Sequence, residues 1–369
     1  MKSIVHSIDE LKMGGAQTHL ITIIEELIAQ HHHDKHYILV LFGNNEFHPE
    51  TSRLKVDVIE LHLEMYFNNN EFLKAYSIVK DKLAFLKPDV VETHLTWSRL
   101  LVNTAAFRLK IKRRIGFEHG DIYMNSLKMR LANFFTQFFF NKIIVCSDEL
   151  KEWVVKTHKI KSSKLKVMYN CVDLSKFKPI QNKRLVIYLE ISTTLPKYTF
   201  ITVGSMGEGV NKRIDISIKA IKVLRDKGLD VGMVICGDGK NRNKLEQLSE
   251  DLDISNSILI LGNRKDVHNI MPHCYAYIHS APYEPFGIVC IEAMASGLPV
   301  IIPNSGGIQK IITDKKEGFI YQSLSEQALA AKVELLIASD YSKFATNALI
   351  KVQEYGVTPY VKTLYSLYE

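Results

Sequence analysis

Short apolar runs alternate with longer amphipathic stretches along most of this chain, and the alternation comes in two successive series. In the first series the stretch 17–29 carries leucine and isoleucine at helical spacing, which predicts a helix. The apolar runs are typical of parallel strands that are buried on both faces, and they lie at 37–42, 90–94, 143–146 and 165–169. Strand–helix alternation of this kind predicts a doubly wound α/β sheet.

A second series begins near residue 200. Its amphipathic stretch 214–225 predicts a helix, and its apolar runs lie at 200–204, 231–236, 258–262, 276–279 and 299–302. At 369 residues the chain is long enough for two domains. We therefore predict an α/β protein with two Rossmann-like, doubly wound lobes that face a central cleft, with the ligand at the carboxyl ends of the strands.

The join between the lobes is predicted at 174–198, where periodicity is weakest and two prolines occur. We place the N-terminal lobe at 1–175, the C-terminal lobe at 176–345 and a last helix at 346–369. Packing of this last helix back against the N-terminal lobe is one arrangement open to it.

The composition excludes several classes of protein. A helix that spans a bilayer needs about 18 or more consecutive apolar residues, and no such run occurs in the sequence. Residues 1–7 are predicted to form a first strand and not a signal peptide. The cysteines are scattered without metal-ligand spacing, which favours free or buried thiols in a reducing cytoplasm: Cys146, Cys171, Cys236, Cys274 and Cys290. We expect a cytoplasmic location, with the cytoplasmic face of the membrane as the alternative.

The net charge of +7 is unevenly distributed. Residues 99–178 hold 17 Lys and Arg against 6 Asp and Glu, and five of these cations fall within 108–114. Such a cluster is compatible with anionic lipid or a phosphate-bearing acceptor, or with a solvated helix end. Without an accompanying motif, nucleic acid is not expected as a partner. The stretch 127–140, basic at its start and rich in phenylalanine, fits either an interfacial membrane helix or an ordinary helix packed under the sheet.

The segment 283–300 carries the strongest chemical signal. The predicted strand 276–279 leads into a tight turn with a proline and a glycine, and a helix is predicted from about Gly287 to Ser296. Free backbone N–H groups at the start of this helix form an anion site suited to a diphosphate, and they belong to Phe286, Gly287, Ile288 and Val289. Glu284 lies in the turn, and Glu292 lies inside the helix among apolar residues, where a carboxylate needs a hydroxyl or cationic partner.

The two glutamates and the residues around them, from Glu284-Pro-Phe-Gly to Ala-Ser-Gly-Leu-Pro-Val300, closely resemble the E-x7-E block of the retaining family 4 glycosyltransferases with the GT-B fold. The resemblance implies that Glu284 contacts hydroxyls of the transferred sugar and that Glu292 contacts the ribose of the nucleotide. A structural helix with two incidental acidic residues is the alternative.

The resemblance extends into the N-terminal lobe, which would bind the acceptor. Gly14 and Gly15 follow the first strand where the family has a glycine loop near the donor phosphates, and a Cβ there would block close backbone approach. His119, in Gly116-Phe-Glu-His-Gly120, matches the family's His-Gly loop and would contact the donor sugar near the reaction centre. Cys171 stands where the family usually has a glycine.

In the C-terminal lobe, Gly204 and the following loop resemble the family's phosphate-binding segment. The resemblance implies that Lys212 reaches the diphosphate, but Ser205 stands where the family has an arginine. Arg213 and Arg264 are candidate replacements, and both are included in the predicted donor site together with Val267, whose loop would lie beside the base. Gly237-Asp-Gly239 matches a structural turn of the family, and 304–307 matches a second glycine loop near the donor.

The implied activity is metal-independent, retaining sugar transfer in which Lys212 and the helix N-terminus stabilise the leaving diphosphate. No cofactor is expected, since the nucleotide-sugar is a co-substrate, and the Asp251-Leu-Asp253 string is read as a helix end instead of a metal motif. A UDP-sugar is the expected donor, with a glycan or lipid-linked acceptor in surface polysaccharide or glycoconjugate assembly. The alternatives are a non-catalytic nucleotide-sugar-binding partner and an epimerase or phosphorylase built on the same lobes.

Overall fold

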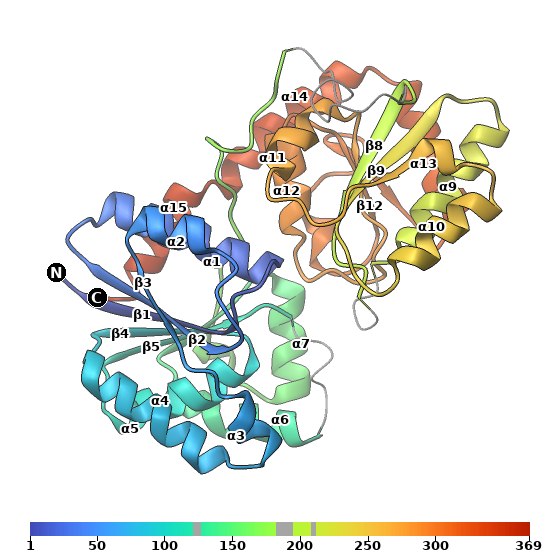
Figure 1. Cartoon of the computed structure of the whole chain (residues 1–369). Helices are drawn as coiled ribbons and strands as arrows, with labels where there is room; N and C mark the ends of the chain where they lie inside the picture. Colours follow the sequence, from blue (N-terminus) through green and yellow to red (C-terminus); the bar gives the residue numbers. More distant parts are fainter. Residues whose placement is uncertain (121–126, 182–194, 208–211) are drawn as a thin grey trace. The chain divides into compact units, whose positions relative to one another are not determined.

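A computed structural model describes residues 1–120, 127–181, 195–207 and 212–369. The chain divides into two compact units (Figure 1). Unit 1 comprises Met1–Asn170 together with Val357–Glu369, and unit 2 comprises Cys171–Gly356. Part of the predicted join, 182–194, lies outside the described residues.

Unit 1 contains a parallel seven-stranded sheet in the order β3-β2-β1-β4-β5-β6-β7. Since the chain runs outward from β1 in one direction and from β4 in the other, the sheet is doubly wound, as predicted, and β1 and β4 flank its switch point. The strands are β1 (Ser3–Glu10), β2 (Lys35–Phe42), β3 (Asp57–Glu60), β4 (Val90–His94), β5 (Arg113–Glu118), β6 (Lys142–Val145) and β7 (Leu165–Val167).

Helices cover both faces of this sheet (Figure 1). They are α1 (Gly15–Gln30), α2 (His48–Leu54), α3 (Glu64–Asn68), α4 (Phe72–Leu86), α5 (Asn103–Arg108), α6 (Leu127–Thr136), α7 (Asp148–His158) and α15 (Val357–Tyr365). Strand β2 shows why its sequence is apolar throughout: Ile38 and Val40 pack against α1, whereas Leu39 and Leu41 pack against α4 and α5. Alternate side chains of one strand therefore enter two separate cores.

Unit 2 contains a parallel six-stranded sheet in the order β10-β9-β8-β11-β12-β13. Its strands are β8 (Tyr198–Val203), β9 (Val231–Cys236), β10 (Ile258–Ile260), β11 (Tyr277–Ile278), β12 (Val300–Pro303) and β13 (Gly318–Tyr321). Its helices are α9 (Ile214–Asp226), α10 (Arg242–Asp251), α11 (Val267–Ile270), α12 (Ile288–Ala295), α13 (Glu326–Ile337) and α14 (Tyr341–Lys351). The predicted α/β class with two Rossmann-like lobes is confirmed. The sequence analysis predicted no strand at β3, β5 or β13.

The end of the chain returns to unit 1. The stretch 346–369, predicted as one helix, is divided between α14 of unit 2 and α15 of unit 1. The hydroxyl of Tyr365 donates to Asp34 at 2.6 Å, and the hydroxyl of Tyr368 donates to the buried carboxylate of Glu92 at 2.6 Å. The two contacts join the C-terminal segment to the residue before β2 and to β4 of unit 1.

Two further findings concern the cysteines and the helices. All five cysteines are free and buried, in agreement with the sequence analysis. Within the part of the chain that the structure describes, no helix combines the length and the apolar character needed to cross a bilayer.

Candidate functional site

The turn between β11 and α12 holds the residues with the strongest chemical signal. Helix α12 begins at Ile288, and Gly287 caps it in a left-handed conformation with φ of 94°. A Cβ at Gly287 would lie 2.8 Å from the side chain of Ile308, so a larger residue fits neither the backbone nor the space. No backbone hydrogen bond from the N–H groups of Gly287, Ile288 and Val289 is found among the described residues, which leaves these groups to bind an anion.

The N–H of Phe286 corrects one prediction. It was expected to be free for a diphosphate, but it donates to the carboxylate of Glu284. The reason is local: a carboxylate two residues before an N–H closes a short side-chain turn. Phe286 therefore orients Glu284 and is not part of the set of free donors.

Glu284 is also paired with Lys212. The ammonium of Lys212 lies 2.6 Å from the carboxylate of Glu284, and both side chains are largely buried. Burial raises the pKa of Glu284, but the charge of Lys212, the nearby His279 and the two hydrogen bonds outweigh this effect and bring the pKa below its usual value. Glu284 is therefore ionised at neutral pH. The fold thus brings together two predicted site residues, a cation and an anion, that lie 72 positions apart in the sequence.

His279, which the sequence analysis did not select, completes this group. Its Nδ1 lies 2.9 Å from the hydroxyl of Tyr277, and its Nε2 lies 3.7 Å from a carboxylate oxygen of Glu284. Burial lowers the pKa of His279 to about 4, so the ring is neutral at physiological pH. The available signal was a histidine at the end of an otherwise apolar strand.

The glycine loop 304–307 supports the Glu284 turn. A Cβ at Gly306 would lie no farther than 3.0 Å from three backbone atoms of Glu284, and Gly306 has a φ of 72°. The hydroxyl of Ser305 donates to the carbonyl of Pro282 at 2.5 Å, and the N–H of Ile308 donates to the carbonyl of Glu284 at 3.3 Å. This loop, which was expected to lie near the donor, thus holds the backbone that carries Glu284.

Glu292 lies on α12, one turn into the helix, as predicted. Burial raises the pKa of Glu292 to about 7, although Lys176 lowers it slightly. No hydrogen bond to its carboxylate is found in the described part of the chain. A partly buried acidic group without a partner is a candidate to bind hydroxyl groups of a ligand.

We expect Glu292→Gln to stabilise the protein above neutral pH. The raised pKa means that folding favours the protonated acid, so the free energy of unfolding falls as pH rises from the unfolded pKa toward about 7. The variant has no such loss. Its midpoint of thermal unfolding should exceed that of the wild type near pH 8 and match it more closely near pH 4.5.

The exposed Glu250 of α10 provides the control, and Glu250→Gln should show no gain that depends on pH. An equal gain for Glu292→Gln at both pH values would contradict the burial of an ionisable carboxyl group at this position.

The loop after β8 is held by the Gly237-Asp-Gly239 turn. The N–H of Gly204 donates to the carbonyl of Cys236 at 3.0 Å, and the N–H of Met206 donates to the carbonyl of Asp238 at 2.9 Å. A Cβ at Gly237 would overlap the carbonyl of Gly204. The turn is therefore structural, as predicted, and it fixes the path of the predicted phosphate loop.

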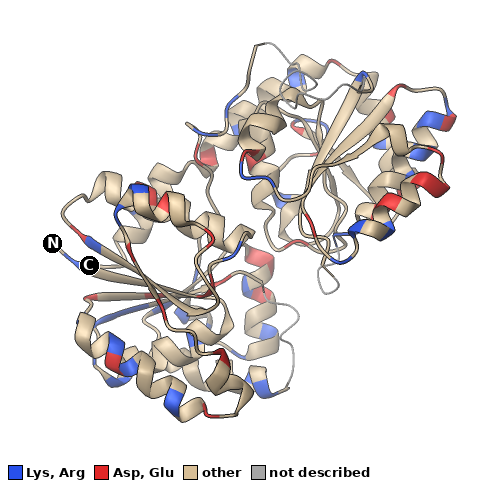
Figure 2. Cartoon of the chain, in the orientation of Figure 1, with Lys and Arg blue, Asp and Glu red and all other residues tan. Residues whose placement is uncertain are grey.

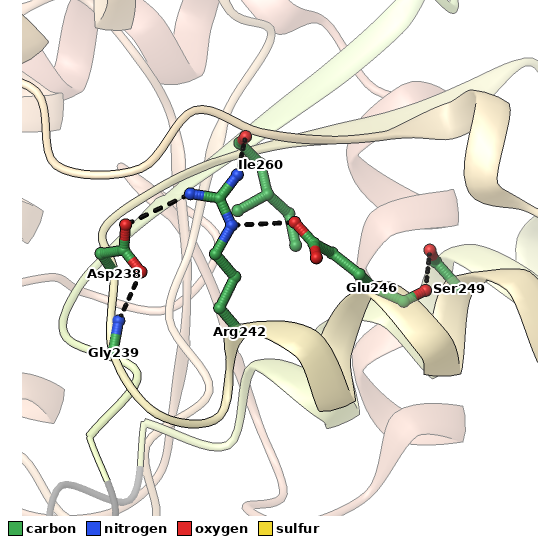
Figure 3. Close-up of polar contacts among 6 residues, drawn as sticks. All are labelled: Asp238, Gly239, Arg242, Glu246, Ser249 and Ile260. Carbon is green, nitrogen blue, oxygen red and sulfur yellow. Dashed lines mark hydrogen bonds and ion pairs between the residues drawn. The ribbon is translucent and has the colours of Figure 1, made fainter.

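A side-chain network anchors this turn from the other side (Figure 3). The guanidinium of Arg242 contacts Asp238 at 3.2 Å, Glu246 at 2.8 Å and the carbonyl of Ile260 at 3.4 Å. Asp238 also accepts the N–H of Gly239 at 2.7 Å. Arg242 thus ties the carboxyl ends of β9 and β10 to the first turn of α10.

Both candidate replacements for the missing arginine at Ser205 form ion pairs with a nearby aspartate. Arg213 forms two hydrogen bonds with Asp215 at 2.9 and 3.0 Å, and Arg264 forms two with Asp266 at 2.7 and 2.6 Å. Each arginine is thus neutralised by an aspartate two positions later. Ser205 itself is exposed and accepts the N–H of Gly207 at 3.2 Å. Val267 begins the short helix α11 directly after the Arg264 loop.

The remaining predicted residues lie in unit 1, at the carboxyl edge of its sheet. Gly14 is the N-cap of α1, and a Cβ at Gly15 would meet no atom within 4 Å. His119 directly follows β5, and its Nε2 lies 3.1 Å from Nδ1 of His94. Burial lowers the pKa of His119 to about 4, so both of its polar atoms act as neutral hydrogen-bonding groups.

Sequence analysis missed the buried groups that surround His119. His94 is fully buried and stacks on Phe117 with ring centroids 4.2 Å apart. Arg99 forms a buried ion pair with Glu118, the residue before His119. These partners come from β4, β5 and the turn Ser98–Val102, and only the fold brings them together.

No metal-binding group is found within the described ranges: no three His, Cys, Asp or Glu side chains there are arranged to hold an ion. The Asp251-Leu-Asp253 string lies at the end of α10, where it was predicted.

Each half of the chain matches the model of a known protein family. Residues 13–176 match the model described as Glycosyltransferase Family 4, and residues 192–350 match the model described as Glycosyl transferases group 1. Among characterised relatives, the UDP-Gal:alpha-D-GlcNAc-diphosphoundecaprenol alpha-1,3-galactosyltransferase of Escherichia coli is 25% identical over 259 residues, or 68% of this chain and 65% of that protein. The matches span between 26% and 65% of the length of eight curated relatives.

Solved structures share the fold along the whole chain. HepE from Anabaena, in complex with UDP and glucose, superposes with a TM-score of 0.84 at 18% identity and covers 99% of both chains. A glycosyltransferase from Rickettsia africae superposes with a TM-score of 0.76 at 19% identity, over 100% of this chain and 98% of the other. At these identities the likeness shows the fold alone.

Proposed function

We propose, from the premise that the chain belongs to family 4 of the glycosyltransferases with the GT-B fold, that it transfers a sugar from a nucleotide-sugar to a hydroxyl group of a glycan or lipid-linked acceptor. The observation that carries this proposal is the Lys212–Glu284 ion pair beside the open N-terminus of α12. In the proposal, Lys212 from the segment before α9 provides a cation for a phosphate, and the turn before α12 provides a carboxylate for sugar hydroxyls and three backbone donors.

In the proposed reaction the diphosphate binds the ammonium of Lys212 and the N–H groups of Gly287, Ile288 and Val289. These groups stabilise the negative charge that develops on the leaving nucleotide, which is the role a divalent metal has in other transferases. Glu284 accepts hydrogen bonds from the sugar, and Glu292 accepts hydrogen bonds from the ribose diol. As the bond between the anomeric carbon and the diphosphate breaks, the acceptor hydroxyl attacks from the same face and passes its proton to an oxygen of the leaving phosphate, so the anomeric configuration is retained without a metal ion.

His119 of unit 1 is the proposed contact to the donor sugar. A neutral imidazole, held through His94, offers a hydrogen bond to the donor sugar without adding charge. Gly14 and Gly15 allow the start of α1 to approach the donor phosphates, since neither carries a side chain. In the proposal this unit also binds the acceptor.

A UDP-sugar is the proposed donor, and surface polysaccharide or glycoconjugate assembly is the proposed setting. Structures of HepE contain UDP and UDP-glucose, and the E. coli relative is named for a UDP-sugar donor and a diphosphoundecaprenol acceptor. A phosphate-bearing, lipid-linked acceptor also suits the surplus of basic residues in 99–178.

A thermal-shift panel of UDP-, GDP- and ADP-sugars tests the donor. A ligand at about 100 times its dissociation constant adds about 2.7 kcal/mol to the free energy of unfolding, which produces a clear shift of the melting temperature. We expect the largest shift with a UDP-sugar. Absence of a shift with all three nucleotides would contradict the proposal.

Product analysis separates the alternatives. Release of free nucleotide only with an acceptor supports transfer, whereas nucleotide-sugar binding without turnover indicates a non-catalytic partner. NMR of a donor-only incubation reveals an epimerised sugar, and a phosphate-dependent product reveals a phosphorylase.

We also propose that unit 1 contacts the cytoplasmic face of a membrane through α6 and the turn that follows it. Five apolar side chains share one exposed face at helical spacing: Leu127, Leu131, Phe134, Phe135 and Phe138. Lys128 is exposed beside them, and the ammonium of Lys161 lies 5.6 Å from the ring centroid of Phe138. Figure 2 shows Lys and Arg along the helices of unit 1. An outward apolar face bordered by cations is typical of an interfacial helix.

Replacing Phe134, Phe135 and Phe138 together by Ser is expected to weaken binding to vesicles that contain anionic lipid by at least about tenfold, because buried aromatic area is lost. Sedimentation with such vesicles provides the measurement. Phe85 of α4 is 80% exposed and serves as the control, since Phe85→Ser should leave binding unchanged. Equal binding of the triple variant and the wild type would contradict this surface.

A further inference from the structure

The Lys212–Glu284 ion pair presents a problem for the proposed reaction, on which this inference rests. When the ammonium of Lys212 binds the diphosphate, Glu284 loses the partner that lies 2.6 Å away. Glu284 then keeps only the hydrogen bond from the N–H of Phe286, which leaves the charge of a partly buried carboxylate poorly compensated and its side chain less firmly directed toward the sugar. Glu284 therefore needs a second donor that does not leave with Lys212.

His279 is placed to be that donor. His279 is only 4% exposed, and its Nε2 is buried without a hydrogen-bond partner in the described part of the chain. This atom faces the carboxylate of Glu284 at 3.7 Å, just beyond hydrogen-bonding distance. A small rotation of the Glu284 side chain, after release of Lys212, closes the gap.

The neighbouring tyrosine determines which nitrogen carries the proton. The hydroxyl of Tyr277, which is 1% exposed, lies 2.9 Å from Nδ1 of His279. A buried hydroxyl donates wherever an acceptor is in reach, so Tyr277 donates to Nδ1 and the proton of the neutral ring resides on Nε2. The opposite tautomer is unfavourable, because it would direct the lone pair of Nε2 at the negatively charged carboxylate of Glu284. Both arguments give an Nε2–H directed at Glu284.

We propose that His279 is a positioning residue, whose Nε2–H takes over the carboxylate of Glu284 when Lys212 turns to the diphosphate. In this role His279 keeps Glu284 ionised and aimed at the sugar hydroxyls throughout the reaction.

The end of β11 is built to hold this arrangement. The N–H of His279 donates to the carbonyl of Ile301 at 2.9 Å, and its carbonyl accepts the hydroxyl of Tyr321 at 3.0 Å. The hydroxyl of the next residue, Ser280, donates to the carbonyl of Lys212 at 2.9 Å. Two successive residues thus fix Glu284 on one side and the backbone of Lys212 on the other.

The first test requires no activity. Long-range ¹H–¹⁵N NMR of the imidazole groups in the whole protein should show His279 neutral with its proton on Nε2. In Lys212→Ala, which removes the competing cation, this Nε2–H should move downfield as its hydrogen bond to Glu284 forms. A proton on Nδ1, or an Nε2–H signal that Lys212→Ala leaves unchanged, would overturn the proposal.

The second test is kinetic. His279→Gln keeps an N–H near the position of Nε2, whereas His279→Asn keeps polar atoms only near Nδ1. We expect Asn to lower kcat by about tenfold, with a smaller change in KM for the donor, and Gln to retain about a third of the wild-type kcat. UDP affinity, which involves no sugar, should be the same in both variants. Equal loss in Gln and Asn would overturn the role of Nε2–H.

The two proposals fail separately. A wild-type protein that transfers no sugar from any nucleotide-sugar refutes the proposed function, and the NMR result still decides the hydrogen bond between His279 and Glu284. An active wild type whose Asn variant matches it in kcat refutes only the role of His279.

Discussion

Alanine at Glu284 or at Lys212 is expected to lower the rate of sugar transfer at least about tenfold, or about 1.4 kcal/mol in activation free energy. Removal of Lys212 deletes the cation that stabilises the leaving diphosphate and leaves Glu284 without its main partner. Removal of Glu284 deletes the acceptor for the sugar hydroxyls. Initial rates with saturating acceptor, measured over a range of donor concentrations, provide the comparison.

The double variant sharpens this prediction. Because the two side chains contact each other, their effects on the activation free energy should not add, and the double variant should be less impaired than the sum of the singles implies. Lys222 and Asp226 form an exposed ion pair at 2.7 Å on α9 and supply the matched control. Lys222→Ala should transfer sugar at the wild-type rate. Wild-type rates in both Glu284→Ala and Lys212→Ala would refute the site.

Gly306→Ala is expected to abolish most of the activity without altering any group that touches the donor in our proposal. The new Cβ would lie no farther than 3.0 Å from three backbone atoms of Glu284, so the turn that carries Glu284 must shift. A displacement of about 1 Å at a reacting group can cost about a hundredfold in rate. Transfer assays, together with the melting temperature, measure the two consequences.

Gly228→Ala is the matched control for this substitution. Gly228 has a φ of 82°, comparable to the 72° of Gly306, but a Cβ there meets no atom within 4 Å. Both variants incur the cost of a positive φ, which is higher at Gly306 because its ψ of −172° lies in a region that only glycine readily adopts, and only Gly306→Ala incurs the collision. Loss of activity in both variants to the same degree would show that backbone strain alone, and not contact with Glu284, is responsible.

Local patterns were sufficient to predict much of this molecule. The β11–α12 segment has a short apolar strand, a turn with Pro285 and Gly287 and a helix, and each depends on neighbours in sequence. The pairing of Lys212 with Glu284 was implied only as two contacts to one ligand, since no local rule places residues 72 positions apart. The resemblance to a family supplied that link.

Two findings at the predicted donor site have a local cause. Arg213 and Arg264 are each followed, two positions later, by an aspartate that binds them in a bidentate pair, and this spacing is visible in the sequence. The N–H of Phe286 is taken by the carboxylate two residues before it. In both cases a short side-chain turn competes with the ligand that we assigned to the group.

The buried partners had no local signal of comparable strength. His94 and Arg99 contact the His119 segment through the pairing of β4 with β5, and the orphan nitrogen of His279 is defined by Tyr277 and Glu284 together. A lone histidine in a sequence is more often a satisfied core residue than a functional one. Only the geometry distinguishes the two.

The return of the chain end to unit 1 has a consequence for biosynthesis. Unit 2 is an insertion between Asn170 and Val357, so a ribosome completes all of unit 2 before it produces the last segment of unit 1. Domains generally fold as soon as they have been synthesised. Until Tyr368 emerges, the fully buried Glu92 of unit 1 lacks the hydroxyl that donates to it at 2.6 Å. Unit 1, most of which is translated first, therefore cannot form all of its contacts until the end of the chain has been synthesised.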